Sequence, residues 1–205
     1  MTKPYTQAHV VTAGANDEFD IAEMLGQALG EEEPNRTLVP DYTVRRTLVE
    51  PYARHTLQVH RSAGALIRTV HDYAGAAVWM PYGHERPDAL VDLKTPGELL
   101  GEFADGYAGY ERARFELRRR VTGDFADYYH LVVFGRRGTG DNPGLESVLL
   151  NDHASELAGT HLYADPSSET LRTTLALHGF REAGRPKHLS ASLTLHPMLR
   201  RAAPA

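Results

Sequence analysis

The feature that most constrains the fold of this chain is a strand pattern that runs through a glycine-rich loop directly into a helix pattern. Residues 128–135, Tyr-Tyr-His-Leu-Val-Val-Phe-Gly, are aromatic and β-branched, as expected of a mostly buried strand. Residues 136–144 contain three glycines, which allow backbone conformations that other residues avoid. An apolar helical stripe begins at Leu145, and we expect Gly159 to end that helix.

A glycine-rich loop that leads into a helix N-terminus can bind an anion, because free N–H groups and the helix dipole point at the ligand. In this chain Asn142 and Pro143 form a good helix start by themselves. Asp141 and Glu146 place two negative charges around the first turn, where they satisfy the dipole and would repel a phosphate. These residues alone therefore favour a structural helix over a phosphate site.

The same stretch resembles the acetyl-CoA-binding core of the GNAT superfamily of N-acetyltransferases. In that family a strand precedes a loop and helix of pattern Gln/Arg-x-x-Gly-x-Gly/Ala, whose backbone holds the CoA pyrophosphate. The resemblance continues downstream with a strand at 162–165, a helix at 168–176 that ends in His-Gly-Phe at 178–180, and a closing strand at 197–200.

Upstream, Gly-Ala-Ala-Val-Trp at 75–79 resembles a strand of puromycin N-acetyltransferase-like members, so the resemblance covers about residues 60–200. It implies an α/β (α+β) fold, in which a twisted, mostly antiparallel sheet carries helices on both faces. It also implies one GNAT-like domain over residues 1–205.

Several positions that carry function in the family hold other residues here. Asp141 stands where the family has Gln or Arg, and Gly144 and Glu146 stand at its two glycines. The family's cofactor-contacting Asn falls at Leu171, and the Tyr that often protonates the departing thiolate falls at Leu175. The resemblance therefore implies a GNAT scaffold whose standard acetyl-CoA chemistry is impaired or replaced.

Three functions follow from this comparison. The first is an enzyme that acts on a small amine- or acyl-containing molecule by repurposed acyl-transfer or acid–base chemistry. The second is a conventional acetyl-CoA-dependent N-acetyltransferase with an atypical CoA site, in which Arg136 and Arg137 offset the nearby acids. The third is a non-catalytic binding subunit. No cofactor is fixed by the sequence, although acetyl-CoA or another acyl thioester fits the resemblance.

The catalytic candidates are His130, Asp165 and Tyr129. By the family layout, His130 lies on the strand that splays from its neighbour, and Asp165 ends the next strand. A His130–Asp165 pair would orient the imidazole and raise its basicity, and a tyrosine phenol could donate to a developing negative charge. A buried structural histidine and a loop-capping carboxylate are the alternatives.

The binding candidates divide into two groups. Trp79, Tyr82 and Tyr128 are candidates for the substrate cleft, although Trp79 is equally expected in the core. The cofactor-binding candidates are Val133, Arg136, Arg137, Gly144 and Ser147.

Local patterns predict the remaining elements. We expect a helix with Phe19 on its inner side, a solvated loop at 31–35, and a helix over 42–61 that is interrupted or bent near Pro51. A capping box at Thr95–Glu98 predicts the start of a long helix. The alternation of apolar and polar residues over 188–199 predicts one half-buried strand.

Composition excludes several functions. The net charge of −5 makes nucleic acid and anionic membranes poor partners, and no segment has the ~20 apolar residues of a membrane helix. The chain has no cysteine, and its 11 histidines show no metal-ligand spacing, so no metal is expected. Residues 1–5 lack a signal-peptide core. We expect a cytoplasmic protein that binds a small molecule, and the family resemblance implies a possible homodimer.

Overall fold

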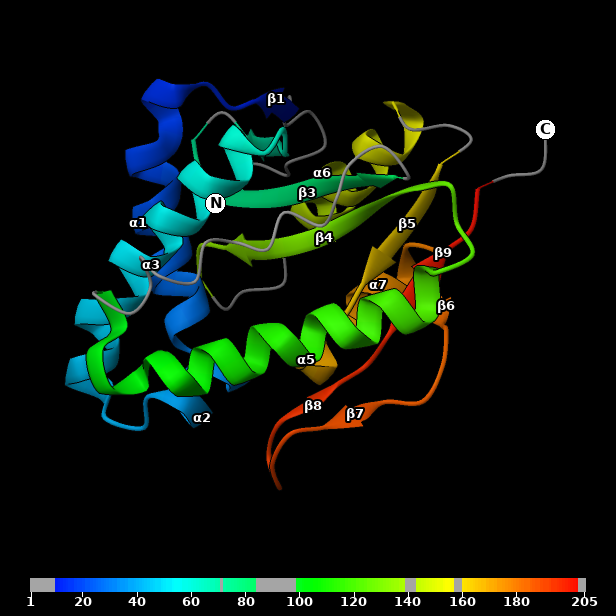
Figure 1. Cartoon of the computed structure of the whole chain (residues 1–205). Helices are drawn as coiled ribbons and strands as arrows, with labels where there is room; N and C mark the ends of the chain where they lie inside the picture. Colours follow the sequence, from blue (N-terminus) through cyan, green and yellow to red (C-terminus); the bar gives the residue numbers. More distant parts are fainter. Residues whose placement is uncertain (1–9, 71, 84–98, 139–142, 157–159, 203–205) are drawn as a thin grey trace.

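The computed structural model of the chain describes residues 10–70, 72–83, 99–138, 143–156 and 160–202. A seven-stranded sheet has the strand order β1-β2-β3-β4-β5-β9-β6, in which β4 and β5 pair parallel and the other neighbours pair antiparallel. A second, two-stranded sheet consists of β7 and β8 (Figure 1). This arrangement confirms the predicted mixed α/β fold with a mostly antiparallel sheet.

The strands of the large sheet are β1 (Val10–Thr12), β2 (Leu66–Val70), β3 (Gly75–Gly83), β4 (Asp127–Arg136), β5 (His161–Ala164), β6 (Arg181–Glu182) and β9 (Met198–Arg200). The helices are α1 (Glu18–Gly30), α2 (Glu33–Leu38), α3 (Tyr42–Ser62), α5 (Ala104–Thr122), α6 (Pro143–Glu156) and α7 (Glu169–Leu177). Short 3-10 turns, Ala15–Asp17 and Gly101–Phe103, precede α1 and α5.

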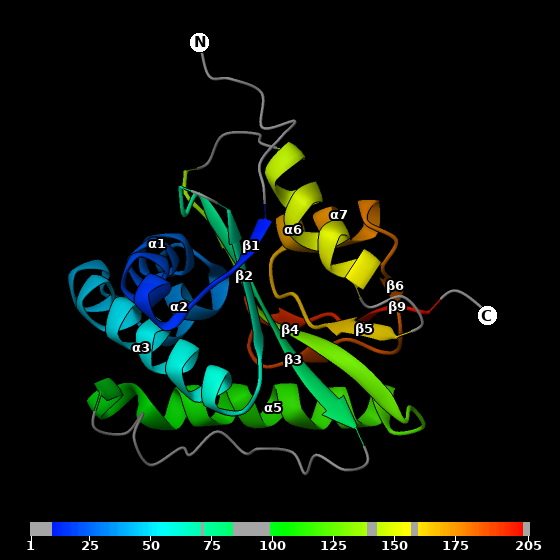
Figure 2. The same cartoon turned by 90° about the horizontal axis from the view of Figure 1, so that it is seen from above.

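Helices cover both faces of the sheet. Figure 2 shows α1 and α3 on one face and α6 and α7 on the other, with α5 running across the strands below them. Alternate residues of β3 pack on opposite faces of the sheet, because successive side chains of a strand point in opposite directions. Ala76 and Val78 belong to the core cluster of α1 and α3, whereas Ala77 and Trp79 belong to the cluster that contains Leu149 of α6.

The two central strands separate part of the way along their length. The parallel pairing of β4 with β5 ends at Leu131 and Ala164, although β4 continues to Arg136. In the pairing of β4 with β3, the register shifts at Val78 and Trp79, so Val132 is an extra, bulged residue on β4. Beyond Leu131, the β5-facing edge of β4 has no strand partner among the described residues.

Two predictions about the N-terminal half are wrong in detail. Phe19 is 59% exposed and lies beneath the guanidinium of Arg54 instead of in the core. The segment expected as a solvated loop begins α2, since Pro34 fits a first helical turn and Asn35 is buried. Of the two alternatives for the next helix, an interruption at Pro51 is absent, because α3 runs through this residue as one helix.

The strand predicted over 188–199 is also wrong. The structure divides it into β7 (Lys187–His188) and β8 (Thr194–Leu195), which pair with each other, and the closing strand β9. Ser190 accepts hydrogen bonds from the backbone of Ser192 and Leu193, and this turn interrupts the alternation. The predicted capping box at 95–98, the loop at 139–142 and the helix end at Gly159 lie outside the described residues.

No helix in the described ranges combines the length and the apolar character that a bilayer crossing requires.

The close approach of α1 to α3 gives a test of the packing. A Cβ added at Gly26 would lie 2.7 Å from Cβ and 2.9 Å from Cα of Glu50, whereas a Cβ at Gly30 meets nothing within 4 Å. We expect Gly26→Ala to lower the free energy of unfolding by about 1–3 kcal/mol through overpacking. Gly30→Ala should leave it unchanged or raise it by up to about 1 kcal/mol. Urea denaturation of both variants measures the free energy of unfolding, and equal effects of the two substitutions would contradict the close approach of α1 to α3 at Gly26.

Candidate active site

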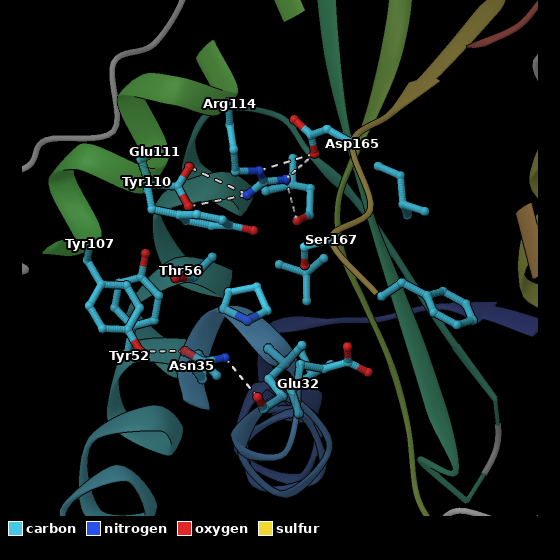
Figure 3. Close-up of a pocket in the computed structure, with 18 of the residues that line it drawn as sticks. Glu32, Asn35, Tyr52, Thr56, Tyr107, Tyr110, Glu111, Arg114, Asp165 and Ser167 are labelled. Carbon is cyan, nitrogen blue, oxygen red and sulfur yellow. Dashed lines mark hydrogen bonds and ion pairs between the residues drawn. The ribbon is translucent and has the colours of Figure 1, made fainter. Parts of the chain in front are cut away.

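A cavity of about 160 Å³ lies where β4 and β5 separate. One side is formed by the edge of β4 from Leu131 to Phe134 and by the segment that follows β5, from Asp165 to Ser168. The other side is formed by α1, α2, α3 and α5 (Figure 3). The cavity therefore contacts both the unpaired strand edge and a set of helical side chains.

Tyrosines form the part of the cavity wall nearest to α2. The rings of Tyr52 and Tyr107 have their centroids 4.9 Å apart in a tilted arrangement. The Tyr107 hydroxyl donates to Oδ1 of Asn35, and the Asn35 amide donates to the carbonyl of Leu29 at 2.8 Å. Burial raises the pKa of Tyr107, so this phenol stays protonated and acts as a donor. The chain of contacts connects α5 to α2 and α1 (Figure 3).

An ion-pair network forms the wall at the strand end. Nη2 and Nε of Arg114 lie 2.9 and 3.1 Å from Oδ1 of Asp165, and Nη1 lies 3.2 Å from Oε1 of Glu111. Nη2 also donates to the bulged carbonyl of Val132 at 3.0 Å. Although burial acts in the opposite direction, Arg114 and His130 hold the pKa of Asp165 below its ordinary value. Asp165 is therefore ionised, with its contacts on Oδ1, while Oδ2 is buried and has no hydrogen-bond partner among the described residues.

The predicted contact of His130 with Asp165 is present, with Nε2 3.2 Å from Oδ1. Asp165 acts on the ring in the expected direction, because it raises the pKa of His130, but burial outweighs it. Burial lowers the pKa of His130 to about 4, despite Asp165, and Arg114 and Arg118 lower it further. Because the ionised carboxylate only accepts, Nε2–H of the neutral ring must donate to it. His130 lies behind the wall and is not among the residues that line the cavity.

The cavity carries a surplus of negative charge. Its lining contains the carboxylates of Glu32, Glu111 and Asp165 and a single guanidinium, Arg114. Tyr110, whose pKa is raised by burial, shares a hydrogen bond with Ser167 between these groups. The site therefore favours a cationic ligand over an anionic one.

The predicted substrate residues lie outside this cavity. Trp79 is fully buried in the cluster with α6, on the opposite face of β3 from Val78. Tyr82 stacks on Tyr128 with ring centroids 5.3 Å apart, and its hydroxyl accepts a hydrogen bond from Arg118 at 2.8 Å. Tyr129, a predicted catalytic residue, is half-buried and packs against the cluster that contains Trp79. None of the four lines the described cavity.

The predicted cofactor residues divide in the same way. Val133 lines the cavity, and Arg137 is exposed. Nε of Arg136 lies 2.9 Å from Oε1 of Glu146 in the first turn of α6, so each neutralises the other. Gly144 and Ser147 are half-buried on the same helix. Leu175, which the family resemblance matches to an acid tyrosine, is fully buried in the core.

Sequence reasoning missed the helical side of the cavity. Tyr107, Tyr110, Glu111 and Arg114 recur on α5 at spacings that place them on one helical face, the pattern usually expected of a packed stripe. On α3 the corresponding pocket residues are Tyr52, Thr56 and His60. The available signal for this part of the site was the presence of polar residues on the helical face that would otherwise be expected to pack into the core.

No family model matches the chain, and no curated protein sequence matches it. Among solved structures, an acetyltransferase related to histone acetyltransferase HPA2 from Corynebacterium glutamicum has a TM-score of 0.68 at 14% identity, over 97% of this chain and 98% of that one. Arylalkylamine N-acetyltransferase 2 from Aedes aegypti has a TM-score of 0.66 at 13% identity, over 96% and 100%.

The C-terminal condensation domain of Ebony, solved with β-alanyl-dopamine, has a TM-score of 0.61 at 7% identity, over 96% of this chain and 99% of that one. These similarities show that the chain has the fold of GNAT acetyltransferases. At these identities they show the fold alone, so activity has to be argued from the site.

The buried imidazole of His130 gives a test by pH. Below about pH 6.5 the unfolded chain protonates this ring, whereas the folded chain resists protonation until about pH 4. Stability should therefore fall as the pH falls through this interval. His130→Gln, whose amide can still donate to Asp165, should reduce that loss by on the order of 3 kcal/mol. Urea unfolding at pH 7 and pH 4 measures it, with His188→Gln on the exposed hairpin as control; identical losses in the two variants would contradict the prediction.

Proposed function

We propose that this chain is an acyltransferase that moves an acyl group from a thioester to the amine of a small acceptor. The observation that carries the proposal is a single cavity that contacts both the unpaired edge of β4 and a wall of tyrosines and carboxylates. A transfer enzyme needs its two reactants to meet in one space. The GNAT fold supports the same class of reaction.

The strand edge supplies the donor side. Beyond Leu131 the edge of β4 has no strand partner in the described part of the chain, so its backbone groups can bond an extended ligand as a further strand would. In the GNAT family this splay accommodates the pantetheine arm. Arg114 fixes the geometry here, because it holds the Val132 carbonyl and Asp165 at the point of separation.

The helical wall supplies the acceptor side. An engineered cavity of about 150 Å³ binds benzene, so a space of this size suits an acceptor whose body is about one ring. Tyr52 and Tyr107 provide aromatic surface, and the surplus carboxylates favour an ammonium group. The arylalkylamine N-acetyltransferase among the structural neighbours is consistent with such an acceptor.

The described part of the CoA site fits the arm of a thioester better than its pyrophosphate. At the first turn of α6, Glu146 occupies the helix end and Arg136 is already paired to it. A pyrophosphate would have to compete with that carboxylate for Arg136. This observation supports a second candidate, in which the acyl donor is a shorter or carrier-bound thioester. The Ebony condensation domain among the structural neighbours is consistent with this alternative.

Blocking the cavity tests the first proposal. Ala108 of α5 lines the cavity, and Ala108→Phe should fill space needed by the acceptor. We expect the wild-type protein to transfer the acyl group of at least one short acyl thioester in a panel to a monoamine. The release of the thiol and the mass of the amide product measure this reaction. In Ala108→Phe the KM for the amine should rise at least about tenfold, a loss of about 1.4 kcal/mol. Ala176→Phe, on the exposed side of α7, is the size-matched control. An unchanged amine KM in Ala108→Phe would contradict the assigned pocket.

The choice of donor is tested at α6. Glu146→Gln removes the carboxylate and frees Arg136 for a phosphate, so the affinity for acetyl-CoA should rise by about three- to tenfold. The affinity for acetyl-pantetheine, which has no pyrophosphate, should stay the same. Calorimetric titration measures both, and Glu169→Gln in the first turn of α7, which breaks the exposed pair with Arg172, is the control. A fall in acetyl-CoA affinity would mean that Glu146 orders the site for CoA.

A further inference from the structure

His60 of α3 has a tautomer that its contacts define. Its Nδ1 lies 2.7 Å from the backbone carbonyl of Thr56, one helical turn earlier. A carbonyl can only accept, so Nδ1 must carry the hydrogen of the neutral ring. The lone pair of the imidazole is therefore on Nε2, for which the described part of the chain offers no hydrogen-bond partner.

His60 is one of the residues that line the cavity. It is 7% exposed and belongs to the lining next to Thr56 and opposite α5. His130, the other strongly buried histidine of this region, has the reverse arrangement: its Nε2–H is committed to Asp165, and it does not line the cavity. Of the two rings, His60 is the one whose basic nitrogen is available to a ligand.

The carboxylates of the cavity are less suitable as proton acceptors. Both oxygens of Glu111 lie near Nη1 of Arg114, at 3.2 and 3.5 Å, and Asp165 is bound by the same guanidinium. The guanidinium therefore already bonds carboxylate oxygens that would have to accept a proton from a ligand. Glu32 lies on the opposite side of the cavity from Glu111, where its charge can attract an ammonium group (Figure 3).

We propose that Nε2 of His60 is the general base of the acyl transfer. This inference rests on the proposed function. Nε2 of His60 accepts one proton from the bound ammonium, which makes the nitrogen a nucleophile, and the imidazolium then releases this proton to solvent. The C–N bond forms as the amine attacks the thioester carbonyl, the C–S bond breaks with its electron pair going to sulfur, and the second proton that the nitrogen loses reaches the thiolate through solvent. Products are an amide and a thiol.

The electrostatic surroundings keep this base neutral. Burial lowers the pKa of His60, the contact with Thr56 and the charge of Glu111 act against this shift, and Arg114 and Arg118 of α5 reinforce it. The ring therefore keeps its lone pair at neutral pH. In the wild type, kcat/KM should fall only as the pH drops below about 6.5, where imidazolium begins to form.

Kinetics of His60→Gln test the assignment. Glutamine can keep the contact with the Thr56 carbonyl but cannot accept the proton. We expect kcat/KM to fall by about 10²–10³-fold at pH 7, with the amine KM changed less than about threefold. The acid limb of the pH profile should disappear, and the deficit should shrink to less than about tenfold near pH 10, where the amine is unprotonated. A merely structural histidine would not produce this recovery. His188→Gln is the control, and Glu32→Gln should raise KM rather than abolish the limb.

The outcomes separate the two proposals. Absence of turnover by the wild type with every thioester and amine would overturn the proposed function and with it the role of His60. If the wild type turns over and His60→Gln keeps the same rate and the same acid limb, the role of His60 as general base is overturned and the proposed function stands. The tautomer of His60 can also be tested without turnover, by ¹⁵N NMR of the histidine side chains in the wild type. The signals that are missing from the spectrum of His60→Gln are assigned to His60. Hydrogen on Nδ1 is expected, and hydrogen on Nε2 in the neutral ring would overturn the assignment.

Discussion

The arrangement of the site depends on the ion pair between Arg114 and Asp165. Arg114 projects from α5, Asp165 follows β5, and the same guanidinium binds the bulged carbonyl of Val132 on β4. One side chain thus joins three elements at the point where the strands separate. Removing one partner of a buried pair costs about 3–5 kcal/mol, because the other charge stays uncompensated. The pair therefore defines the shape of the cavity, and it also withdraws Asp165 from acid–base chemistry.

This constraint separates two histidines that the sequence cannot distinguish. Both His60 and His130 are buried, and burial lowers the pKa of each. They differ in the groups they face. A carboxylate and a guanidinium surround His130, which takes part in the ion-pair network as a donor. A backbone carbonyl orients His60, a residue of the cavity lining, through Nδ1, so that its lone pair is on Nε2. The partner of the bonded nitrogen, more than burial, decides which imidazole can accept a proton.

The sequence predicted the half of the site that the sheet supplies. A strand pattern followed by a glycine loop, together with the family resemblance, placed His130 and Asp165 on adjacent strands, and the structure brings them within 3.2 Å. It could not predict that Arg114 takes the carboxylate, because α5 lies between β3 and β4 in the chain and its position depends on tertiary packing. The same limit explains residues 188–199, where a local alternation was interrupted by a serine turn.

The structure also changes the argument about the acyl donor. From the sequence, Glu146 was a negative charge that would repel a pyrophosphate. With Arg136 at 2.9 Å and both side chains mostly buried, the pair is close to neutral, so simple repulsion overstates the obstacle. The remaining obstacle is competition, since a phosphate can recruit Arg136 only by leaving a carboxylate at the first turn without its partner. A donor that ends before the pyrophosphate avoids that exchange, and the open edge of β4 can bind its arm in either case.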